Sequence, residues 1–231
     1  MPAESLPNVE IWHIPTTKNS LMSQQLFMQL SVDEQLRARQ IHDPIQKNTY
    51  ITSHAALRNI IASHLNIAIE EINLVNNKEG KPLLGNDPSF FFNLSHTHHY
   101  ALLGLSNHCQ IGIDIEFVNQ KRDALAIAKR FFSQDEYEWL IQIEPSQQIP
   151  CFYQLWCHKE AYLKGIGTGL QGGLSTFTLS CKDLHESCII PDQKNNQWKL
   201  DAIDVPSPYK AALSVNCTEH LIKIQHWQAD V

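Results

Sequence analysis

The sequence predicts an α+β fold, and three observations support this class. Patterns typical of helices precede patterns typical of strands in each half of the 231-residue chain. This order differs from the strict strand–helix alternation of a doubly wound sheet, and no short repeat indicates a solenoid. Apolar residues make up 43% and charged residues 18% of the chain, which is ordinary usage for one large or two small folded domains.

Helices are expected to come before strands in the first half. Ser31 and Glu34 stand at the spacing of a capping box and predict that a helix begins there. A second helix is predicted around Arg58, where apolar residues recur at helical spacing. The expected elements are helices at 31–40 and 49–65, a turn at 79–82, and strands at 89–94 and 100–105.

The second half repeats this order after a first strand. The polar run that begins at Ser133 is typical of a helix start, and the glycines from Gly165 onward are expected to end a later helix. The expected elements are a strand at 111–118, helices at 123–132, from 133 and at 151–164, a polar linker at 144–150, and strands at 175–180, 188–191, 198–205, 209–215 and 222–227.

Charge and cysteine usage limit the function classes. A formal net charge of −6 argues against a surface built to bind nucleic acid, although a local cluster can still hold a small polyanion. The first ten residues do not resemble a secretory signal and no apolar stretch is long enough to cross a bilayer, so we expect a cytoplasmic protein without membrane contact. We expect reduced thiols, without CxxC pairs, at Cys109, Cys151, Cys157, Cys181, Cys188 and Cys217.

The segment GIDIE presents two carboxylates on one face of a predicted strand. Residues two apart in a strand share a face, so Gly112, Asp114 and Glu116 lie together while three isoleucines take the other face. Two carboxylates beside a glycine fit a hard-cation site with space for a ligand. An edge strand with a solvated acidic face explains the same spacing.

The helix predicted at 151–164 adds a third carboxylate. Trp156, Glu160 and Lys164 are spaced four residues apart and share one helical stripe. Magnesium takes a few carboxylates and accepts phosphate oxygens in its remaining positions, and Lys159 and Lys164 are candidates to bind such oxygens as point charges. A solvated pair between Glu160 and Lys164 is the alternative for the lysine.

The motifs in combination resemble the 4′-phosphopantetheinyl transferases, in particular the larger, Sfp-type group. They stand in the family's order and at about its spacing, over residues 80–170. They are GKP at 80–82, FNLSH at 92–96, GIDIE at 112–116, KRFFSQDEY at 129–137 and WCHKEAYLKGIGTGL at 156–170.

The resemblance implies a fold and a set of ligands. It implies two similar α+β halves related by a pseudo-twofold axis, here 1–110 and 111–231, with coenzyme A and magnesium in the cleft between them. The implied magnesium ligands are Asp114, Glu116 and Glu160. The implied coenzyme A contacts are Lys164 and Lys159 near the pyrophosphate, Ser95 and His96 at the 3′-phosphate, and Lys81 and Pro82 beside the adenine.

The basic residues that complete the 3′-phosphate site are less clearly marked. Arg37 and Arg39 are the first candidates, followed by Lys47 and Arg58, while Thr49 stands where some relatives have an arginine. Arg58 is equally explained by an ion pair on a helix face. The resemblance implies a monomer, because the two halves of one chain make the cleft.

The implied reaction is transfer of phosphopantetheine from coenzyme A to a serine of an apo acyl or peptidyl carrier protein. Glu160 is the expected base, or orients a water that acts as one, and Lys164 offsets charge on the leaving group. An exposed patch at Phe131, Phe132 and Tyr137 is a candidate landing surface for the carrier, unless these rings belong to the core. A metal-dependent phosphohydrolase and a binding module without chemistry are the competing functions.

Overall fold

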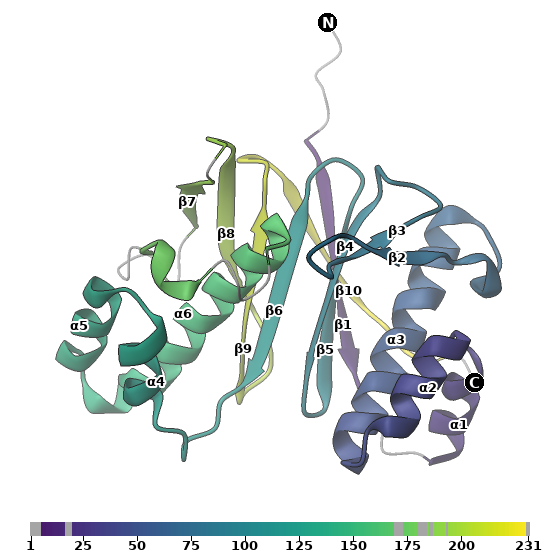
Figure 1. Ribbon diagram of the computed structural model, residues 1–231, viewed down its shortest axis with the longest axis horizontal. Coiled ribbons are helices and arrows are strands. Elements are labelled where there is room, and N and C mark those ends of the chain that lie inside the picture. Colours follow the sequence, from purple (N-terminus) through teal and green to yellow (C-terminus); the bar gives the residue numbers. More distant parts are fainter. Residues whose placement is uncertain are drawn as a thin grey trace, which may run out of the picture.

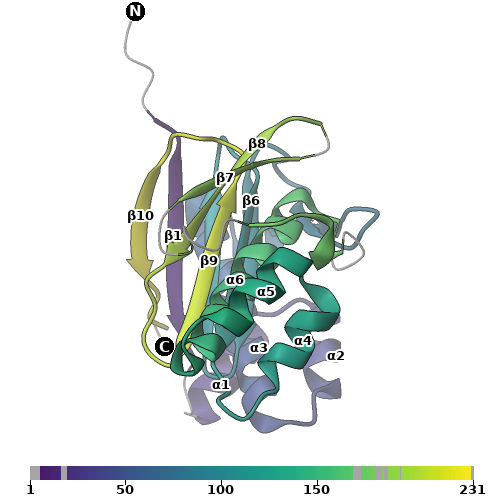
Figure 2. The ribbon, with the colours of Figure 1, turned by 90° about the vertical axis from the view of Figure 1, so that its left-hand side faces the viewer.

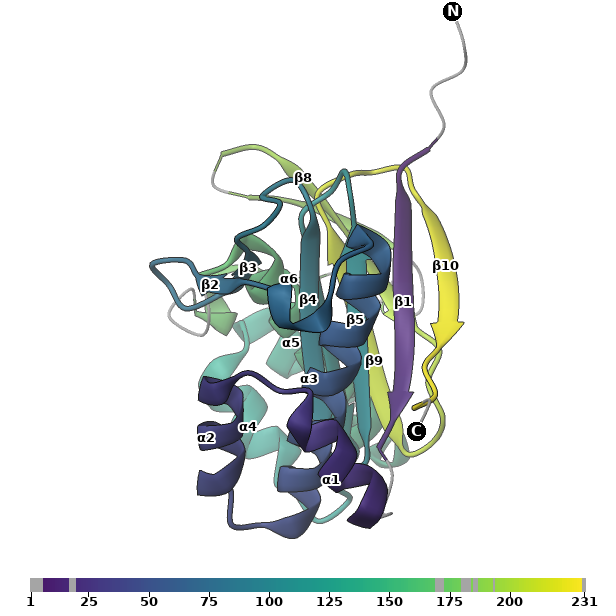
Figure 3. The same ribbon diagram turned by 90° about the vertical axis from the view of Figure 1, so that its right-hand side faces the viewer.

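The protein has two four-stranded sheets in the middle of the molecule, with helices on both flanks, and a small two-stranded sheet of β2 and β3 (Figure 1). The computed structural model describes residues 6–16, 20–168, 173–179, 184, 187–192 and 194–229. The helices of both halves lie toward the same side, and β1 and β10 lie toward the opposite side (Figures 2 and 3). The predicted α+β class is confirmed.

The elements follow one another in a similar order in the two halves. The helices are α1 (Ser20–Met28), α2 (Val32–Gln40), α3 (Pro44–Leu65), α4 (Ala124–Phe131), α5 (Gln134–Gln142) and α6 (Pro145–Ile166), with short 3₁₀ helices η1 (Ile69–Glu71) and η3 (Leu174–Thr176). The strands are β1 (Asn8–Pro15), β2 (Leu74–Asn76), β3 (Pro82–Leu84), β4 (Phe91–Thr97), β5 (Tyr100–Ser106), β6 (Ile111–Phe117), β7 (Cys188–Pro191), β8 (Gln197–Ile203), β9 (Tyr209–Val215) and β10 (Leu221–His226).

The last strand crosses from the second half into the first. One sheet has the order β10-β1-β5-β4 and the other the order β6-β9-β8-β7. β10 pairs in parallel with β1, with Leu221 opposite Asn8 and His226 opposite His13, whereas the other strand pairs of both sheets are antiparallel. β10 thus joins the sheet of the first half by pairing with a strand more than 200 residues away in the sequence, and such pairing leaves no trace in a local pattern.

Side chains of β4 join the two sheets by capping the backbone of β6. The Ile113 amide donates to Asn93 Oδ1 at 2.8 Å, and the Ile115 amide donates to Ser95 Oγ at 3.3 Å. Both acceptors are buried. The free edge of β6 is thus satisfied by side chains of the other half, which fixes β4 beside the carboxylates of β6.

Two helices begin at the predicted caps, and both caps are capping boxes. Ser31 caps α2 with Glu34, and Ser133 caps α5 with Glu136, each pair exchanging both bonds. The predicted linker at 144–150 is wrong, because these residues form the first turns of α6. Its first helical position is Pro145, where the missing N–H costs nothing, and the polar side chains of this turn face water.

The predicted strand at 175–180 is also wrong within the described residues. Leu174–Thr176 forms a 3₁₀ turn, and Ser180 lies outside the described part of the chain. The ring of Phe177 packs edge-on against Tyr162, with 4.8 Å between centroids. Packing onto α6 has replaced pairing with a neighbouring strand here.

Cys109 and Cys217 form a disulfide, which corrects the expectation that these cysteines are reduced. Cys109 follows β5 and Cys217 follows β9, and the neighbouring backbones are hydrogen-bonded because the Gln110 and Asn216 segments pair. Strand pairing brings together cysteines that are 108 residues apart in sequence. Cys151 and Cys157 are thiols as expected, whereas the prediction for Cys181 lies outside the described residues.

No helix among the described residues has both the length and the apolar character needed to cross a membrane.

Candidate active site

The close contact between β6 and α6 determines where the candidate carboxylates lie. A Cβ atom on Gly112 would lie 2.0 Å from the Ala161 carbonyl oxygen and 2.3 Å from the Gly165 nitrogen. Gly112 therefore allows the strand to touch the helix backbone, and it leaves no space for a ligand. The sequence interpretation of this glycine is wrong in that respect, but the contact brings Asp114 beside the last turns of α6.

Asp114, Ser95 and Lys164 form a hydrogen-bonded cluster from β6, β4 and α6. Lys164 Nζ donates to Asp114 Oδ1 at 2.6 Å and to Ser95 Oγ at 3.0 Å, and the Ser95 hydroxyl lies 3.0 Å from the same carboxylate oxygen. Asp114 is 3% exposed. Burial acts to lower the pKa of Lys164, but the attraction of Asp114 and then of Glu160 outweighs it and raises the pKa above its usual value.

Glu116 and Glu160 border this cluster and share its electrostatic field. Burial, followed by repulsion from Asp114, raises the pKa of each carboxyl to about 7. Lys164 opposes the shift in both cases. The two groups therefore hold protons more tightly than ordinary glutamates do.

The chemistry of these carboxylates fits a divalent cation. Asp114 Oδ2 and Glu160 Oε1 are buried oxygens without a hydrogen-bond partner among the described residues. A cation would satisfy both and remove the repulsion that raises the pKa of Glu116 and Glu160. In the part of the chain that is described, no three His, Cys, Asp or Glu side chains already form a metal-binding group, and Asp114 is held by the ammonium of Lys164 instead.

His96 and Arg37 both line a pocket of about 590 Å³ beside this cluster. The pocket lies between α2, the start of α3 and the end of β4, and is also lined by Thr49, Tyr50 and His98. Desolvation, followed by the charges of His54 and Lys164, lowers the pKa of His96 to about 4, although its ring still reaches the solvent.

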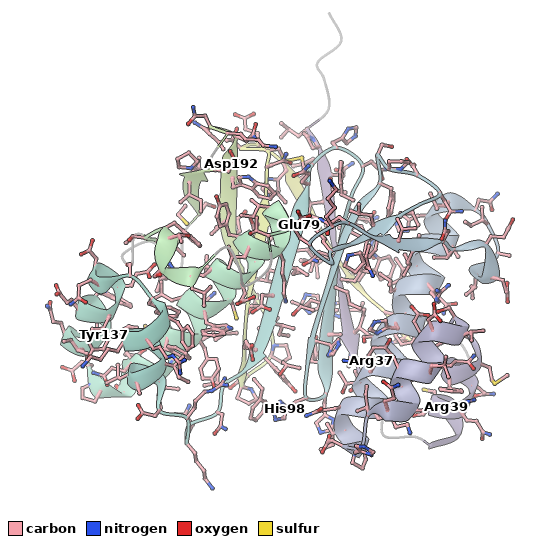
Figure 4. All side chains as sticks on the ribbon, in the orientation of Figure 1. Arg37, Arg39, Glu79, His98, Tyr137 and Asp192 are labelled. Carbon is pink, nitrogen blue, oxygen red and sulfur yellow. A yellow bond between two sulfur atoms is a disulfide. The ribbon has the colours of Figure 1, made fainter. Side chains whose placement is uncertain are left out.

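The other basic candidates of the first half point elsewhere. Arg37 faces the middle of the molecule, whereas Arg39 lies farther out (Figure 4). The Arg39 guanidinium lies 5.5 Å from the centroid of the Phe27 ring. Arg58 is buried and bonded to Glu34 at 2.6 Å, as the ion-pair alternative expected. Lys47 lines a separate pocket between α1 and α3.

Lys81 and Pro82 lie on the other side of the cluster. They line a pocket of about 240 Å³ together with Lys164 and Asn93. Lys81 Nζ donates to the Ile111 carbonyl at 3.0 Å and to the Gly165 carbonyl at 2.7 Å, so it ties the β2–β3 turn to β6 and α6. Burial lowers its pKa to about 8.

Lys159 does not reach this site, which corrects the expectation that it binds pyrophosphate. Its side chain is fully buried, and Nζ donates to Glu136 Oε1 and to the Phe177 carbonyl, both at 2.7 Å. The ammonium also lies 4.1 Å from the centroid of the Phe177 ring. A cation enclosed in this way holds α5 and the 177 segment onto α6 and has no path to a ligand.

The proposed aromatic landing patch is mostly core. Phe132 is 5% exposed and Tyr137 is half-buried on the outer flank of the second half (Figure 4). Phe131 alone keeps an exposed ring, 40% accessible and 5.0 Å from the Arg130 guanidinium. Phe132 and Tyr137 therefore follow the general tendency of apolar residues in helical segments to be buried.

Three residues near the site were not singled out from the sequence. Asn93 caps β6, and Tyr50 and His54 bring their rings to within 6.4 and 6.1 Å of His96. The last two stand four residues apart on α3, so their shared helix face was visible in the sequence. Their proximity to His96 was not, because it depends on how α3 packs against β4.

Known proteins resemble both halves of the chain. The 4′-phosphopantetheinyl transferase superfamily matches residues 110–214, and the N-terminal part of a 4′-phosphopantetheinyl transferase matches residues 14–108. A putative 4′-phosphopantetheinyl transferase of Synechocystis is 33% identical over 85% of this chain and 80% of its own length. The transferase HetI of Nostoc is 34% identical over 70% of each chain, and Sfp of Bacillus subtilis is 28% identical over 83% of each. The chain therefore belongs to the 4′-phosphopantetheinyl transferase superfamily.

Proposed function

We propose that the protein transfers the 4′-phosphopantetheine of coenzyme A to a serine of an apo acyl or peptidyl carrier protein and releases adenosine 3′,5′-bisphosphate. Family membership supports this reaction. The observation that carries the proposal is the cluster of Asp114, Ser95 and Lys164 at the junction of the two halves, with a pocket on either side.

The two pockets divide the recognition of coenzyme A. The 3′-phosphate contacts Ser95 and His96 in the pocket that Arg37 also lines, and the adenine lies beside Lys81 and Pro82. The pyrophosphate lies at Lys164 between them. Lys81 contributes through its aliphatic stem and the turn that it anchors, because its ammonium is already held by two carbonyls.

The carrier serine hydroxyl attacks the β-phosphate. A serine O–P bond forms, the P–O bond of the pyrophosphate bridge breaks, and its electron pair leaves with adenosine 3′,5′-bisphosphate. Glu160 accepts the serine proton directly or through a water. Lys164 neutralises charge on the leaving group, and fixed positioning supplies much of the rate gain.

Magnesium is the proposed cation, with Asp114, Glu116 and Glu160 as its ligands. Bound there, it supplies positive charge to the pyrophosphate oxygens. The two unpartnered carboxylate oxygens and the raised pKa values of the glutamates support this assignment.

The two halves are proposed to be related by a pseudo-twofold axis. A strand, two short helices and a helix of 22 residues follow one another in both halves. The capping glutamates Glu34 and Glu136 each hold a buried cation from the long helix of their own half, namely Arg58 and Lys159. One chain then completes the cleft, which supports a monomer. The proposal also includes a cytoplasmic location without nucleic-acid or membrane partners.

Mass spectrometry of the carrier tests the transfer. The protein is incubated with coenzyme A, magnesium and an apo carrier, and the carrier must gain the mass of the phosphopantetheine arm. Lys164→Ala and Asp114→Ala are expected to lower kcat at least about 10²-fold. Lys223→Ala is the control, since Lys223 is 62% exposed and far from the cluster. Free phosphate with an unmodified carrier would instead show a hydrolase, and nucleotide binding without either product would show a binding module.

A further inference from the structure

Three aromatic side chains form a compact group at the rim of the pocket that holds His96. Tyr50 stacks on His54 with 3.9 Å between ring centroids, and both rings stand edge-on to His96 at 6.4 and 6.1 Å. Tyr50 lines the pocket, and His54 lies directly behind it on α3. A histidine outside the sequence motifs therefore lies within reach of the charge on any anion bound at His96.

The hydrogen bonds of His54 define its neutral form. Nδ1 lies 2.9 Å from the Tyr50 carbonyl oxygen, which can only accept, so Nδ1 carries the proton. A second proton must then go to Nε2 and makes the ring cationic. Burial is the main cause that lowers the pKa of His54, and the ring is neutral at pH 7 when no ligand is bound.

Permanent positive charge is scarce around this group. On α2, Arg37 lines the pocket. Glu34 of α2 raises the pKa of His54 and Arg58 of α3 lowers it, and these two residues form an ion pair with each other. Asp43, just before α3, and His98, just after β4, also line the pocket. Lys164 of α6 is paired with Asp114. Among the described residues that line the pocket, Arg37 is the only lysine or arginine.

We infer that His54 acts with His96 as a protonatable pair that sets how strongly the enzyme prefers coenzyme A over 3′-dephospho-coenzyme A, and that this preference falls as the pH rises. The inference rests on the proposed function, because it places the 3′-phosphate at His96. His54 acts through the charge that it adds beside His96, and is therefore a residue that determines specificity without touching the reacting atoms.

The direction of the pH effect follows from proton uptake. The free pocket holds both histidines neutral, and a phosphate dianion favours their cationic forms, so binding takes up protons. Affinity then falls by up to tenfold per pH unit for each proton taken up. A phosphate monoester is dianionic above its second pKa of about 6, so fixed cations alone give a constant preference between pH 6.5 and 8.5.

The experiment compares kcat/KM for coenzyme A and for 3′-dephospho-coenzyme A between pH 6.5 and 8.5. Both substrates share the magnesium carboxylates and Glu160, so titration of those groups cancels in the ratio. We expect the ratio to fall by about tenfold over this range. In His54→Gln the fall should shrink to less than about threefold, because only the proton taken up by His96 remains. In His54→Lys the ratio should stay high and fall no more steeply than in His54→Gln, because the second charge is then permanent.

His64→Gln is the matched control, since His64 lies at the other end of α3 beside Glu10 and should leave the ratio of the wild type unchanged. A flat ratio in the wild type, or a full pH dependence in His54→Gln with the wild-type melting temperature, would overturn the inference. If neither substrate modifies the carrier at any pH, the proposed function itself fails, so the two failures are distinguishable.

Discussion

Replacing Lys159 tests whether the second lysine of the helix motif is a structural residue. Lys159 and Glu136 are both fully buried, and the ammonium makes two hydrogen bonds of 2.7 Å. Lys159→Ala leaves the carboxylate of Glu136 buried with only the amides of Ser133 and Leu179 as donors. Breaking one partner of a buried ion pair costs about 3–5 kcal/mol. For a chain of this size the melting temperature should fall by roughly 6–20 °C.

The assay combines thermal unfolding with kinetics at a temperature where the variant is folded. KM for coenzyme A should stay within about twofold of the wild type, because Lys159 has no path to the ligand. The double variant Lys159→Met with Glu136→Gln should recover part of the lost stability, since it removes both charges and keeps the capping side chain. A wild-type melting temperature together with a tenfold rise in KM would show that Lys159 binds the substrate and that its burial has been misread.

Three further perturbations test other parts of the structure. Gly112→Ala should destabilise the fold by about 1–3 kcal/mol or more, because the new Cβ would lie 2.0 Å from the Ala161 carbonyl oxygen. The melting temperature should fall accordingly, and a shift below 2 °C would contradict the close contact. The disulfide spans 108 residues and should contribute about 4–5 kcal/mol to the free energy of unfolding. A reductant should therefore lower the melting temperature of the oxidised wild type but not that of Cys217→Ser, and equal responses would exclude the bond. Without metal, the pKa values of Glu116 and Glu160 are raised, so the folded state binds more protons than the unfolded state. The contribution of these two glutamates to the free energy of unfolding therefore falls as the pH rises from about 4.5 to 7. Magnesium should therefore raise the melting temperature more at pH 8 than at pH 5.5, and Glu160→Gln should reduce that difference; an equal rise at both pH values would argue against these ligands.

Local patterns predicted the elements whose ends are fixed by local chemistry. The capping-box spacing of Ser31 and Glu34 predicts the start of α2, and the polar run that begins at Ser133 predicts the start of α5. The strand at Tyr209–Val215 was predicted with its observed bounds, because its apolar run ends at turns on both sides. The strand β10 was also predicted, within one residue of its bounds, but its pairing with β1 and the disulfide were not, since both depend on partners more than 100 residues distant.

The separate roles of Lys159 and Lys164 were available in the sequence. Residues in an α-helix are about 100° apart, so Glu160 and Lys164 differ by about 40° around the axis. Lys159 and Lys164 differ by about 140°, and the two cannot face the same ligand. Proximity in a motif was given more weight than helical geometry, and the expectation for Lys159 failed for that reason.

The proposed duplication of the fold accounts for the proposed division of roles, in which α6 carries the acid–base chemistry and α3 recognises phosphate. Arg58 and Lys159 each stand fourteen residues after the first residue of a 22-residue helix, and each is bonded to a capping glutamate. The same offset places Asn59 where α6 has Glu160 and Ser63 where it has Lys164.

Asn59 is a neutral side chain that donates to Gln29 Oε1 and to the Ala55 carbonyl. The helix of the first half thus keeps the buried ion pair that holds its scaffold together but lacks the carboxylate and the ammonium of the site. Its own contribution comes two turns earlier, from Tyr50 and His54 beside His96. Substitutions at Glu160 should therefore affect turnover, whereas substitutions at His54 should affect the choice of nucleotide.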